Sequence, residues 1–223
     1  MAPRELKVGR VAPQSGAVKQ VVIFLHGYGA DGNDLLGLAQ PLGAHMPDTL
    51  FLAPDAPEPC RNNPMGYQWF PIPMMDGSSE QEAATSFAQS VEDLNVFLDG
   101  VLEAEGVTPD QVALIGFSQG TMMSLHVAPR REAPFAGLVG FSGRLLEPER
   151  LKAEMKSKLP ILLAHGDQDP LVPFESMGMA AEALSEAGFP VYTFTMEGTP
   201  HGIAPEGLSQ AFAFLREFLL KDG

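Results

Sequence analysis

One short stretch, Gly116-Phe117-Ser118-Gln119-Gly120, most constrains how this chain can fold. The run before it, 112–115, is short, apolar and β-branched at both ends, which is typical of a strand buried on both faces of a parallel sheet. The run after it, 121–128, carries helix-compatible residues and stops before Pro129. A glycine on each side of Ser118 lets a strand turn sharply into a helix. The sequence therefore predicts a tight strand–turn–helix unit with Ser118 at its apex.

A serine at this apex has two interpretations. The pattern Gly-x-Ser-x-Gly between a strand and a helix is typical of a nucleophilic serine, and the free N–H groups of a helix N-terminus favour an anion there. The alternative is a glycine-rich turn whose serine only caps the helix, because this short pattern also occurs often by chance. The choice depends on whether a base and an acid occur at matching places elsewhere in the chain.

The other apolar runs predict strands that alternate with helices. Apolar or alternating runs predict strands at 21–25, 49–53, 135–141, 161–164 and 191–196, with a weaker edge strand at 6–11. Helix-compatible runs predict helices at 34–45, 80–105, 151–158, 176–187 and 206–220. This alternation predicts an α/β fold with a mostly parallel central sheet and helices on both faces. Because no internal repeat or linker composition interrupts the pattern, residues 1–223 are expected to form one domain.

Composition limits the classes of function. The chain has 14 Lys and Arg against 28 Asp and Glu residues, a net charge of −14, which argues against nucleic acid or an anionic membrane surface as a main partner. The single cysteine, Cys60, excludes an intrachain disulfide. No apolar run approaches the ~20 residues of a membrane-spanning helix, and residues 1–11 lack the apolar core of a signal peptide. We therefore expect a cytoplasmic protein without integral membrane association.

One long segment, 54–77, has neither helical nor strand periodicity. It is rich in proline and carries four large apolar side chains of interest, Trp69, Phe70, Met74 and Met75. A loop of this length is usually functional or disordered, and its aromatic content argues against disorder. Because aromatic rings and flexible thioethers suit an apolar ligand of variable length, these side chains are predicted to line a pocket. The alternative is that they only anchor the loop to the rest of the protein.

Polar loops are predicted at the carboxyl ends of the strands, where binding sites form in open α/β sheets. A nucleophilic serine needs a base within hydrogen-bond reach, and that base needs a third group to orient it. His201 lies in a Gly- and Pro-rich loop after the last strand and is the predicted base. Asp167 and Asp169 both follow the preceding strand, and the residues alone leave the acid open between them.

The other four histidines are expected to have structural roles. His126 lies within the helix after Ser118, and His45 lies near a helix end. His26 and His165 each follow a strand and precede a glycine, which favours hydrogen bonds that stabilise a turn.

Acyl transfer through a serine also needs two N–H donors for the oxyanion. One normally comes from the residue after the serine and the other from the loop after an early strand. The predicted donors are the backbone amides of Gln119 and of Leu25, which stands at the mouth of the His26-Gly27 turn.

Five separated motifs together resemble one known family. They are Leu25-His26-Gly27, Gly116-Phe117-Ser118-Gln119-Gly120, Ser142-Gly143, the stretch 165–173 and His201-Gly202. The chain order of nucleophile, acid and histidine is that of an α/β-hydrolase. The motifs are similar to those of the phospholipase/carboxylesterase family, which contains small bacterial carboxylesterases and the acyl-protein thioesterases. The resemblance spans nearly the whole chain. It implies an α/β-hydrolase fold, a triad of Ser118, Asp169 and His201, oxyanion amides on Leu25 and Gln119, and neither a metal nor another cofactor.

Two details of the resemblance favour the bacterial esterase branch. Thr121 stands where the thioesterase branch usually has a second glycine, and the loop 26–35 is similar to that of the bacterial esterases. The implied function is a serine carboxylesterase that hydrolyses short- to medium-chain acyl esters of small molecules through an acyl-enzyme. Lysophospholipase or acyl-thioester hydrolysis is the alternative within the family, and a non-catalytic binding module is a remote one. The sequence leaves open the physiological substrate and whether the chain forms a homodimer.

Overall fold

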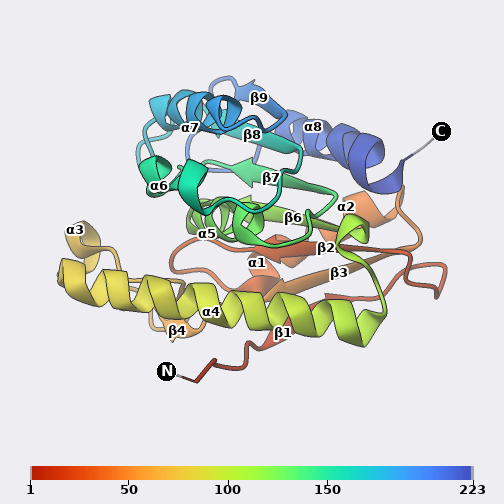
Figure 1. The fold of residues 1–223 in the computed structure, drawn as a ribbon, viewed down its shortest axis with the longest axis horizontal. Helices are drawn as coiled ribbons and strands as arrows, with labels where there is room; N and C mark the ends of the chain where they lie inside the picture. Colours follow the sequence, from red (N-terminus) through yellow and green to blue (C-terminus); the bar gives the residue numbers. More distant parts are fainter. Residues whose placement is uncertain (1, 222–223) are drawn as a thin grey trace.

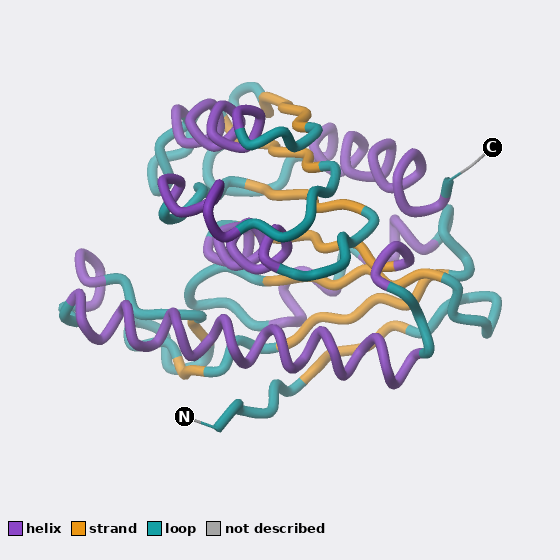
Figure 2. Tube along the Cα trace, viewed as in Figure 1, coloured by secondary structure: helices purple, strands orange, loops and turns teal. Residues whose placement is uncertain are grey.

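A seven-stranded sheet with helices on both faces organises the protein (Figures 1 and 2). The structure is a computed structural model that describes residues 2–221. The strand order is β1-β3-β2-β6-β7-β8-β9, and every neighbouring pair is parallel except β1 and β3. The strands are β1 (Val8–Val11), β2 (Gln20–Leu25), β3 (Thr49–Pro54), β6 (Val112–Phe117), β7 (Gly137–Phe141), β8 (Ile161–Gly166) and β9 (Val191–Met196). The predicted architecture, a mostly parallel sheet with helices on both faces, is confirmed.

The helices form two layers because each buried strand is apolar on both faces. In β2, Ile23 packs into a cluster with the helices on one face, and Phe24 packs into the cluster on the other face. The first face carries α4 (Glu80–Glu105), α5 (Gln119–Val127), α6 (Pro148–Glu154) and α7 (Glu175–Glu186). The second carries α1 (Gly32–Leu36), α2 (Ala39–Gly43) and α8 (Pro205–Leu215), which a π-helical turn at Arg216–Leu220 extends.

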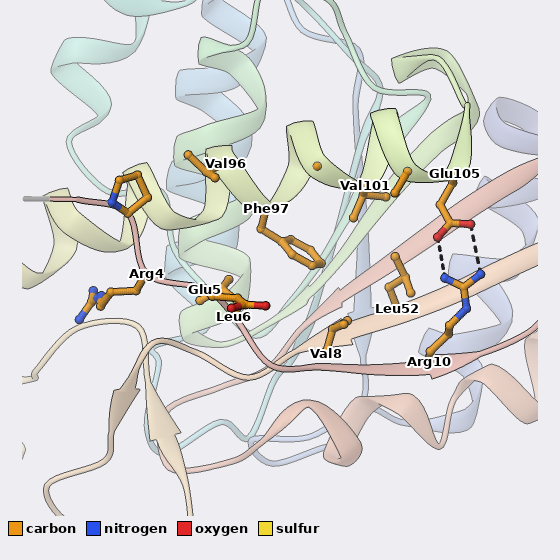
Figure 3. A pocket seen from close by; sticks show the side chains of 13 residues that line it. Arg4, Glu5, Leu6, Val8, Arg10, Leu52, Val96, Phe97, Val101 and Glu105 are labelled. Atoms are coloured by element: carbon orange, nitrogen blue, oxygen red, sulfur yellow. Dashed lines mark hydrogen bonds and ion pairs between the residues drawn. The ribbon is translucent and has the colours of Figure 1, made fainter.

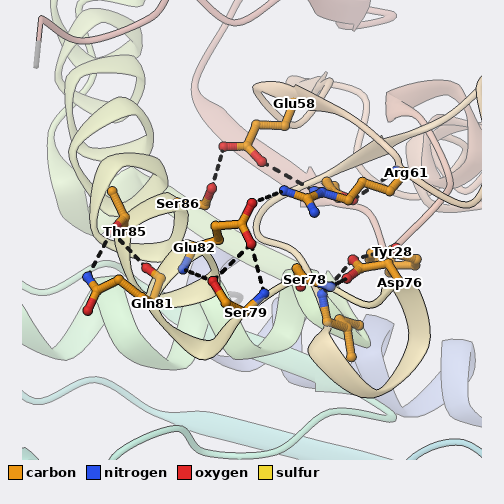
Figure 4. Close-up of polar contacts among 12 residues, drawn as sticks. Tyr28, Glu58, Arg61, Asp76, Ser78, Ser79, Gln81, Glu82, Thr85 and Ser86 are labelled. Atoms are coloured by element: carbon orange, nitrogen blue, oxygen red, sulfur yellow. Dashed lines mark hydrogen bonds and ion pairs between the residues drawn. The ribbon is translucent and has the colours of Figure 1, made fainter.

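The long helix α4 has the bounds predicted from the sequence. Ser79 caps its N-terminus by accepting a hydrogen bond from the Glu82 N–H, and the Glu82 side chain accepts one from the Ser79 N–H in return (Figure 4). Gly106, with a φ of 65°, ends the helix in the left-handed conformation that glycine adopts easily. The start and end of α4 therefore follow from local capping chemistry.

Three regions differ from the prediction. The helix expected at 151–158 is α6, which begins earlier, at Pro148, and ends at Glu154. The helix expected at 34–45 is divided into α1 and α2, which lie on either side of residues 37–38. The segment 54–77 contains the short antiparallel ribbon β4 (Glu58–Pro59) and β5 (Tyr67–Gln68) and the one-turn helix α3 (Pro73–Asp76). The carboxylate of Asp76 holds α3 in place. It accepts a hydrogen bond from the Tyr28 hydroxyl at 3.0 Å (Figure 4), and another from the Ile72 N–H at 2.8 Å.

The edge strand β1 closes one side of the sheet against α4. Arg10 on β1 forms a bidentate ion pair with Glu105 at the end of α4, with N–O distances of 2.5 and 3.1 Å (Figure 3). A hollow of about 560 Å³ lies between the N-terminal segment and α4, and its lining includes none of the residues predicted to be catalytic. None of the helices that the structure describes is long and apolar enough to cross a membrane.

Candidate active site

Ser118 lies at the sharp turn between β6 and α5. Its φ of 53° and ψ of −114° are unusual for a residue with a side chain, and such strain persists only where the surroundings enforce it. One such constraint is the Ser118 N–H, which donates a hydrogen bond to the Phe141 carbonyl at the end of the neighbouring strand β7, at 2.8 Å. The backbone at the apex is therefore held by the sheet.

The two glycines of the motif allow α5 to lie against the sheet. A Cβ on Gly120 would collide with the Leu25 carbonyl, and a Cβ on Gly116 would lie 2.5 Å from the Thr121 nitrogen. Alanine at either position would push the helix away from the strands. The glycine requirement predicted from the sequence thus has a steric cause.

Asp169 and His201 meet at the carboxyl end of β8. The Nδ1 atom of His201 lies 2.7 Å from Oδ2 of Asp169. The other carboxylate oxygen accepts hydrogen bonds from the Leu171 and Val172 N–H groups at 2.8 and 2.9 Å. Burial by itself would raise the pKa of Asp169, but the hydrogen bonds from His201, Val172 and Leu171 outweigh it and lower the pKa below its ordinary value. An ionised Asp169 therefore keeps the proton of His201 on Nδ1 and leaves Nε2 free to act as a base.

Asp167, the other candidate acid, has a different partner. Its Oδ1 accepts a hydrogen bond of 2.7 Å from the Gly198 N–H. This bond joins the loop after β8 to the loop after β9, which carries His201. Asp167 therefore stabilises the loop pair.

Ser118 and His201 line the same cavity, which has a volume of about 340 Å³. The ring of Phe117, the residue before Ser118, lies 4.8 Å from the ring of His201. The rest of the lining comes from the loops after β2, β7 and β8, from the segment 72–75 and from α1 and α5, and it consists of Gly27, Tyr28, Ala30, Asp34, Ile72, Met74, Met75, Gln119, Met122, Arg144, Leu171, Val172 and Pro173. The cavity brings Ser118 and His201 together with a largely apolar wall.

The prediction that Leu25 supplies an oxyanion donor does not fit this geometry. Leu25 is the last residue of β2, is fully buried and does not line the cavity. Tyr28, three residues later, does line it. The Tyr28 N–H and the Gln119 N–H donate to no other group within residues 2–221. The free amide thus comes after the His26-Gly27 turn, at Tyr28, and not at the end of β2.

Trp69 and Phe70 were predicted to line the pocket, and this is wrong. Trp69 is fully buried, with its indole N–H donating to the His26 carbonyl at 3.0 Å. Phe70 packs edge-on against Phe87, with ring centroids 5.3 Å apart. Neither side chain lines the cavity. Both belong to the core behind it, as the alternative interpretation of this loop had it.

The backbone of Trp69 and Phe70 instead binds the side chain of Gln119. The Trp69 N–H donates to Oε1 of Gln119 at 2.9 Å, and Nε2 of Gln119 donates to the Phe70 carbonyl at 2.7 Å. The Ser90 hydroxyl on α4 donates to the Trp69 carbonyl. The Gln119 side chain therefore joins the first residue of α5 to the segment that forms one wall of the cavity.

Met74 and Met75 do line the cavity, as predicted. They lie on α3, and 98% of the Met74 surface and 53% of the Met75 surface are exposed. Two thioethers exposed to this degree form an adaptable apolar rim.

His26 and His165 have the structural roles expected of them. Nδ1 of His26 donates to the Gly27 carbonyl at 2.7 Å, and Nε2 accepts from the Ala56 N–H at 2.9 Å. Burial lowers the pKa of His26 and keeps it neutral. Nε2 of His165 lies 3.0 Å from the Val172 carbonyl. Neither ring lines the cavity.

Among residues 2–221, no group of three or more His, Cys, Asp or Glu side chains is arranged to hold a metal ion.

Comparison with known proteins identifies relatives over the whole chain. The model of a family described as phospholipase/carboxylesterase matches residues 6–219. A solved structure described as esterase PE8 has a TM-score of 0.91 and 40% identity, covering 97% of this chain and 100% of that one. Acyl-protein thioesterase 1 of Gibberella zeae is 28% identical over 95% of this chain and 97% of its own length. A probable carboxylesterase of Oryza sativa subsp. japonica is 28% identical over 93% of this chain and 82% of its own.

Proposed function

The chain belongs to the phospholipase/carboxylesterase family of α/β-hydrolases and is a serine esterase, and on this premise we propose that it cleaves short- to medium-chain acyl esters through an acyl-enzyme on Ser118. The single observation that carries the proposal is the 2.7 Å contact between His201 and Asp169 at the wall of the cavity that Ser118 also lines. An oriented base beside a serine at a strand–helix turn is what activation of a hydroxyl requires.

In the proposed acylation step, Oγ of Ser118 attacks the ester carbonyl while Nε2 of His201 accepts the hydroxyl proton. The C=O electron pair moves onto oxygen, and the N–H groups of Gln119 and Tyr28 stabilise that oxyanion. Each such donor is typically worth about 3 kcal/mol in the transition state. Asp169 stabilises the imidazolium, which has gained a proton. When the intermediate collapses, His201 passes this proton to the departing alkoxide.

Water completes the proposed cycle in deacylation. His201 removes a proton from the water as it attacks the acyl-enzyme carbonyl, and the same two N–H groups stabilise the second oxyanion. Collapse breaks the bond to Oγ, and Ser118 regains its proton from His201. The products are a carboxylic acid and free enzyme, and every proton in this scheme moves through His201.

The acyl group is proposed to lie against Ile72, Met74 and Met75. A cavity of about 340 Å³ is at the small end of ligand sites, which supports a preference for short to medium chains. Cleavage of acyl thioesters is the second candidate, because the curated relatives named acyl-protein thioesterase 1 match nearly the whole chain. The 40% identity to a structure described as an esterase favours the oxygen ester. A cytoplasmic location is part of the proposal and is open to test by cell fractionation.

The test compares nitrophenyl esters of increasing acyl length with a matched acyl thioester. We expect the highest kcat/KM for a short or medium oxygen ester. Ser118→Ala should fold normally and lose turnover by several orders of magnitude, because the turn geometry belongs to the backbone and the nucleophile is the hydroxyl. A fluorophosphonate should label the wild-type protein at Ser118. Turnover by a folded Ser118→Ala protein at the wild-type rate would disprove the mechanism, and a higher kcat/KM for the thioester would favour the second candidate.

A further inference from the structure

Arg144 is a charged residue of the cavity that the proposed reaction does not use. It is exposed, it lines the cavity, and it forms neither an ion pair nor a hydrogen bond within the part of the chain that the structure describes. Arginine side chains elsewhere find carboxylates, as in the pairs Arg10–Glu105 and Arg130–Glu154. In a chain with 28 acidic residues, an arginine left without one at the mouth of the candidate site is unusual.

A strained turn brings Arg144 to this position. Ser142 is fully buried, with a φ of 47°, and its N–H donates to the Ala164 carbonyl at 2.9 Å. At Gly143 the chain passes so close to the turn at Ser118 that a Cβ would lie 2.9 Å from the Ser118 carbonyl oxygen. Only tight packing maintains a non-glycine residue in this conformation. Gly143 therefore packs directly against the turn at Ser118, and Arg144 is the next residue along the chain.

The sheet order places Arg144 on one particular side of Ser118. Ser118 follows β6, which lies between β2 and β7. Tyr28 comes after β2, and through Asp76 it holds the segment that carries Met74 and Met75. Arg144 comes after β7. The apolar rim and the arginine therefore lie on opposite sides of Ser118.

The charged side chains of the cavity are divided in the same way, with an acidic one on the β2 side of Ser118 and a basic one on the β7 side. Asp34, on α1 after β2, lines the cavity and is exposed. An anionic group would be repelled on the Asp34 side and attracted on the Arg144 side. The planar guanidinium group can bind a carboxylate or a phosphate through two parallel hydrogen bonds. Since the protein as a whole repels anions with a net charge of −14, such a group needs a local cation to bind.

We propose that Arg144 binds an anionic group on the alcohol part of the substrate, so that the preferred substrates are acyl esters of hydroxy acids or of phosphorylated alcohols. The inference rests on the proposed function, which places the acyl chain against Ile72, Met74 and Met75 and leaves the Arg144 side to the alcohol. Carboxylate and phosphate share the chemistry that Arg144 recognises, and the two sources are distinguished by the substrates chosen below.

The experiment uses two matched substrate pairs with one acyl group. O-butyrylglycolate is compared with neutral O-butyrylglycolamide, and butyryl-glycerol 3-phosphate is compared with butyryl-glycerol. The quantity measured is the ratio of kcat/KM for the anionic ester to kcat/KM for its neutral counterpart. In Arg144→Gln this ratio should fall about tenfold, mainly through KM, and the fall should shrink as salt is added. In Arg144→Glu the ratio should fall further. The pair with the larger fall identifies carboxylate or phosphate as the natural group.

Lys158→Gln is the matched control. Lys158 is exposed and, like Arg144, has no ion pair within residues 2–221, but it precedes β8 at the opposite edge of the sheet. The Lys158→Gln variant loses the same positive charge as Arg144→Gln, but far from the cavity. Its ratio of kcat/KM for the anionic ester to kcat/KM for the neutral ester should therefore stay at the wild-type value. An equal fall in Lys158→Gln would show a general charge effect and overturn the proposal. An unchanged ratio in Arg144→Gln for both pairs would also overturn it.

Binding to Ser118→Ala separates this inference from the proposed function. The variant cannot cleave the esters by the proposed route, so calorimetry can compare the Kd of each anionic ester with that of its neutral partner, with and without Arg144→Gln. A wild-type protein that cleaves none of the four esters would count against the proposed function. The ratio of the Kd values for the anionic and neutral esters would still show whether Arg144 binds the anionic group. Equal Kd values for the anionic and neutral partners would overturn the role of Arg144 alone.

Discussion

At the scale of single residues, two aspartates only two positions apart have different partners. Asp169 contacts His201 at 2.7 Å, whereas Asp167 accepts a hydrogen bond from Gly198. In Asp169→Asn the side-chain amide would face His201 with its NH₂ group and force the proton onto Nε2. Turnover should fall by about 10⁴, the size of the corresponding effect in a serine protease.

Asp167→Asn is the comparison, because an asparagine oxygen can still accept the Gly198 N–H. It should cost about 1 kcal/mol of stability and keep most of the activity. Both variants are checked by thermal melts and by kcat on one short ester. An inactive Asp167→Asn beside an active Asp169→Asn would reverse the assignment of the acid.

His126 should make stability depend on pH although it lies outside the candidate site. Its ring packs edge-on against Phe87 at 4.7 Å, and burial, with a smaller contribution from Arg130, lowers its pKa from 6.5 to about 4. Between these two pH values the unfolded chain binds a proton that the folded chain does not. The free energy of unfolding therefore falls as the pH is lowered through this window, and the effect ends below pH 4.

Over this pH window, protonation of His126 should lower the free energy of unfolding by roughly 2 kcal/mol, after allowance for its partial solvent access. Urea unfolding of wild type and His126→Gln at pH 7 and pH 4.5 measures it, with exposed His45→Gln as control. The loss on acidification should be smaller in His126→Gln. An equal loss in all three proteins would contradict the assignment.

At the scale of elements, Gln119 connects α5 to the wall of the cavity. Gln119→Glu keeps an acceptor for the Trp69 N–H but places a carboxylate oxygen against the Phe70 carbonyl, which now lies 2.7 Å from Nε2. We expect a loss of about 1–3 kcal/mol in stability at pH 8 and a lower kcat/KM. Protonation of the new carboxyl group at lower pH restores a donor, so activity relative to wild type should recover between pH 8 and pH 5.

A matched control for this variant is Gln81→Glu, which makes the same change on the exposed face of α4. Its activity relative to wild type should not vary with pH. If Gln119→Glu behaves in the same way, the side chain of Gln119 does not position the cavity wall.

At the scale of the whole molecule, the net charge of −14 opposes the compact state. Ion pairs such as Arg150–Glu154 are exposed and contribute little individually. Screening of the excess negative charge should therefore outweigh the weakening of these pairs, and Tm should rise by a few degrees between about 0.01 and 0.3 M NaCl. Calorimetric melts at three salt concentrations test this. A falling Tm would mean that the ion pairs matter more than the net repulsion.

The sequence by itself determined the α/β alternation, the bounds of α4, the places of Ser118 and His201, and two candidate acids, Asp167 and Asp169, between which only the family resemblance chose. These features depend on local rules. Apolar runs form buried strands, a capping box starts a helix, and in a parallel sheet the loops after successive strands gather at one edge. The loops that carry Asp167, Asp169 and His201 are therefore predicted to lie at one edge of the sheet, and the structure shows His201 in contact with Asp169.

Only the tertiary structure decided which groups in the irregular loops face the cavity. Gln119 binds the backbone of Trp69 and Phe70, some 50 residues away, and this turns those two side chains into the core while Met74 and Met75 reach the cavity. The same holds for Tyr28 in place of Leu25 as a free amide, and for Arg144, which no motif distinguished. In a segment without periodicity, long-range hydrogen bonds set the direction of each side chain. Local sequence patterns do not show which distant residues form those hydrogen bonds.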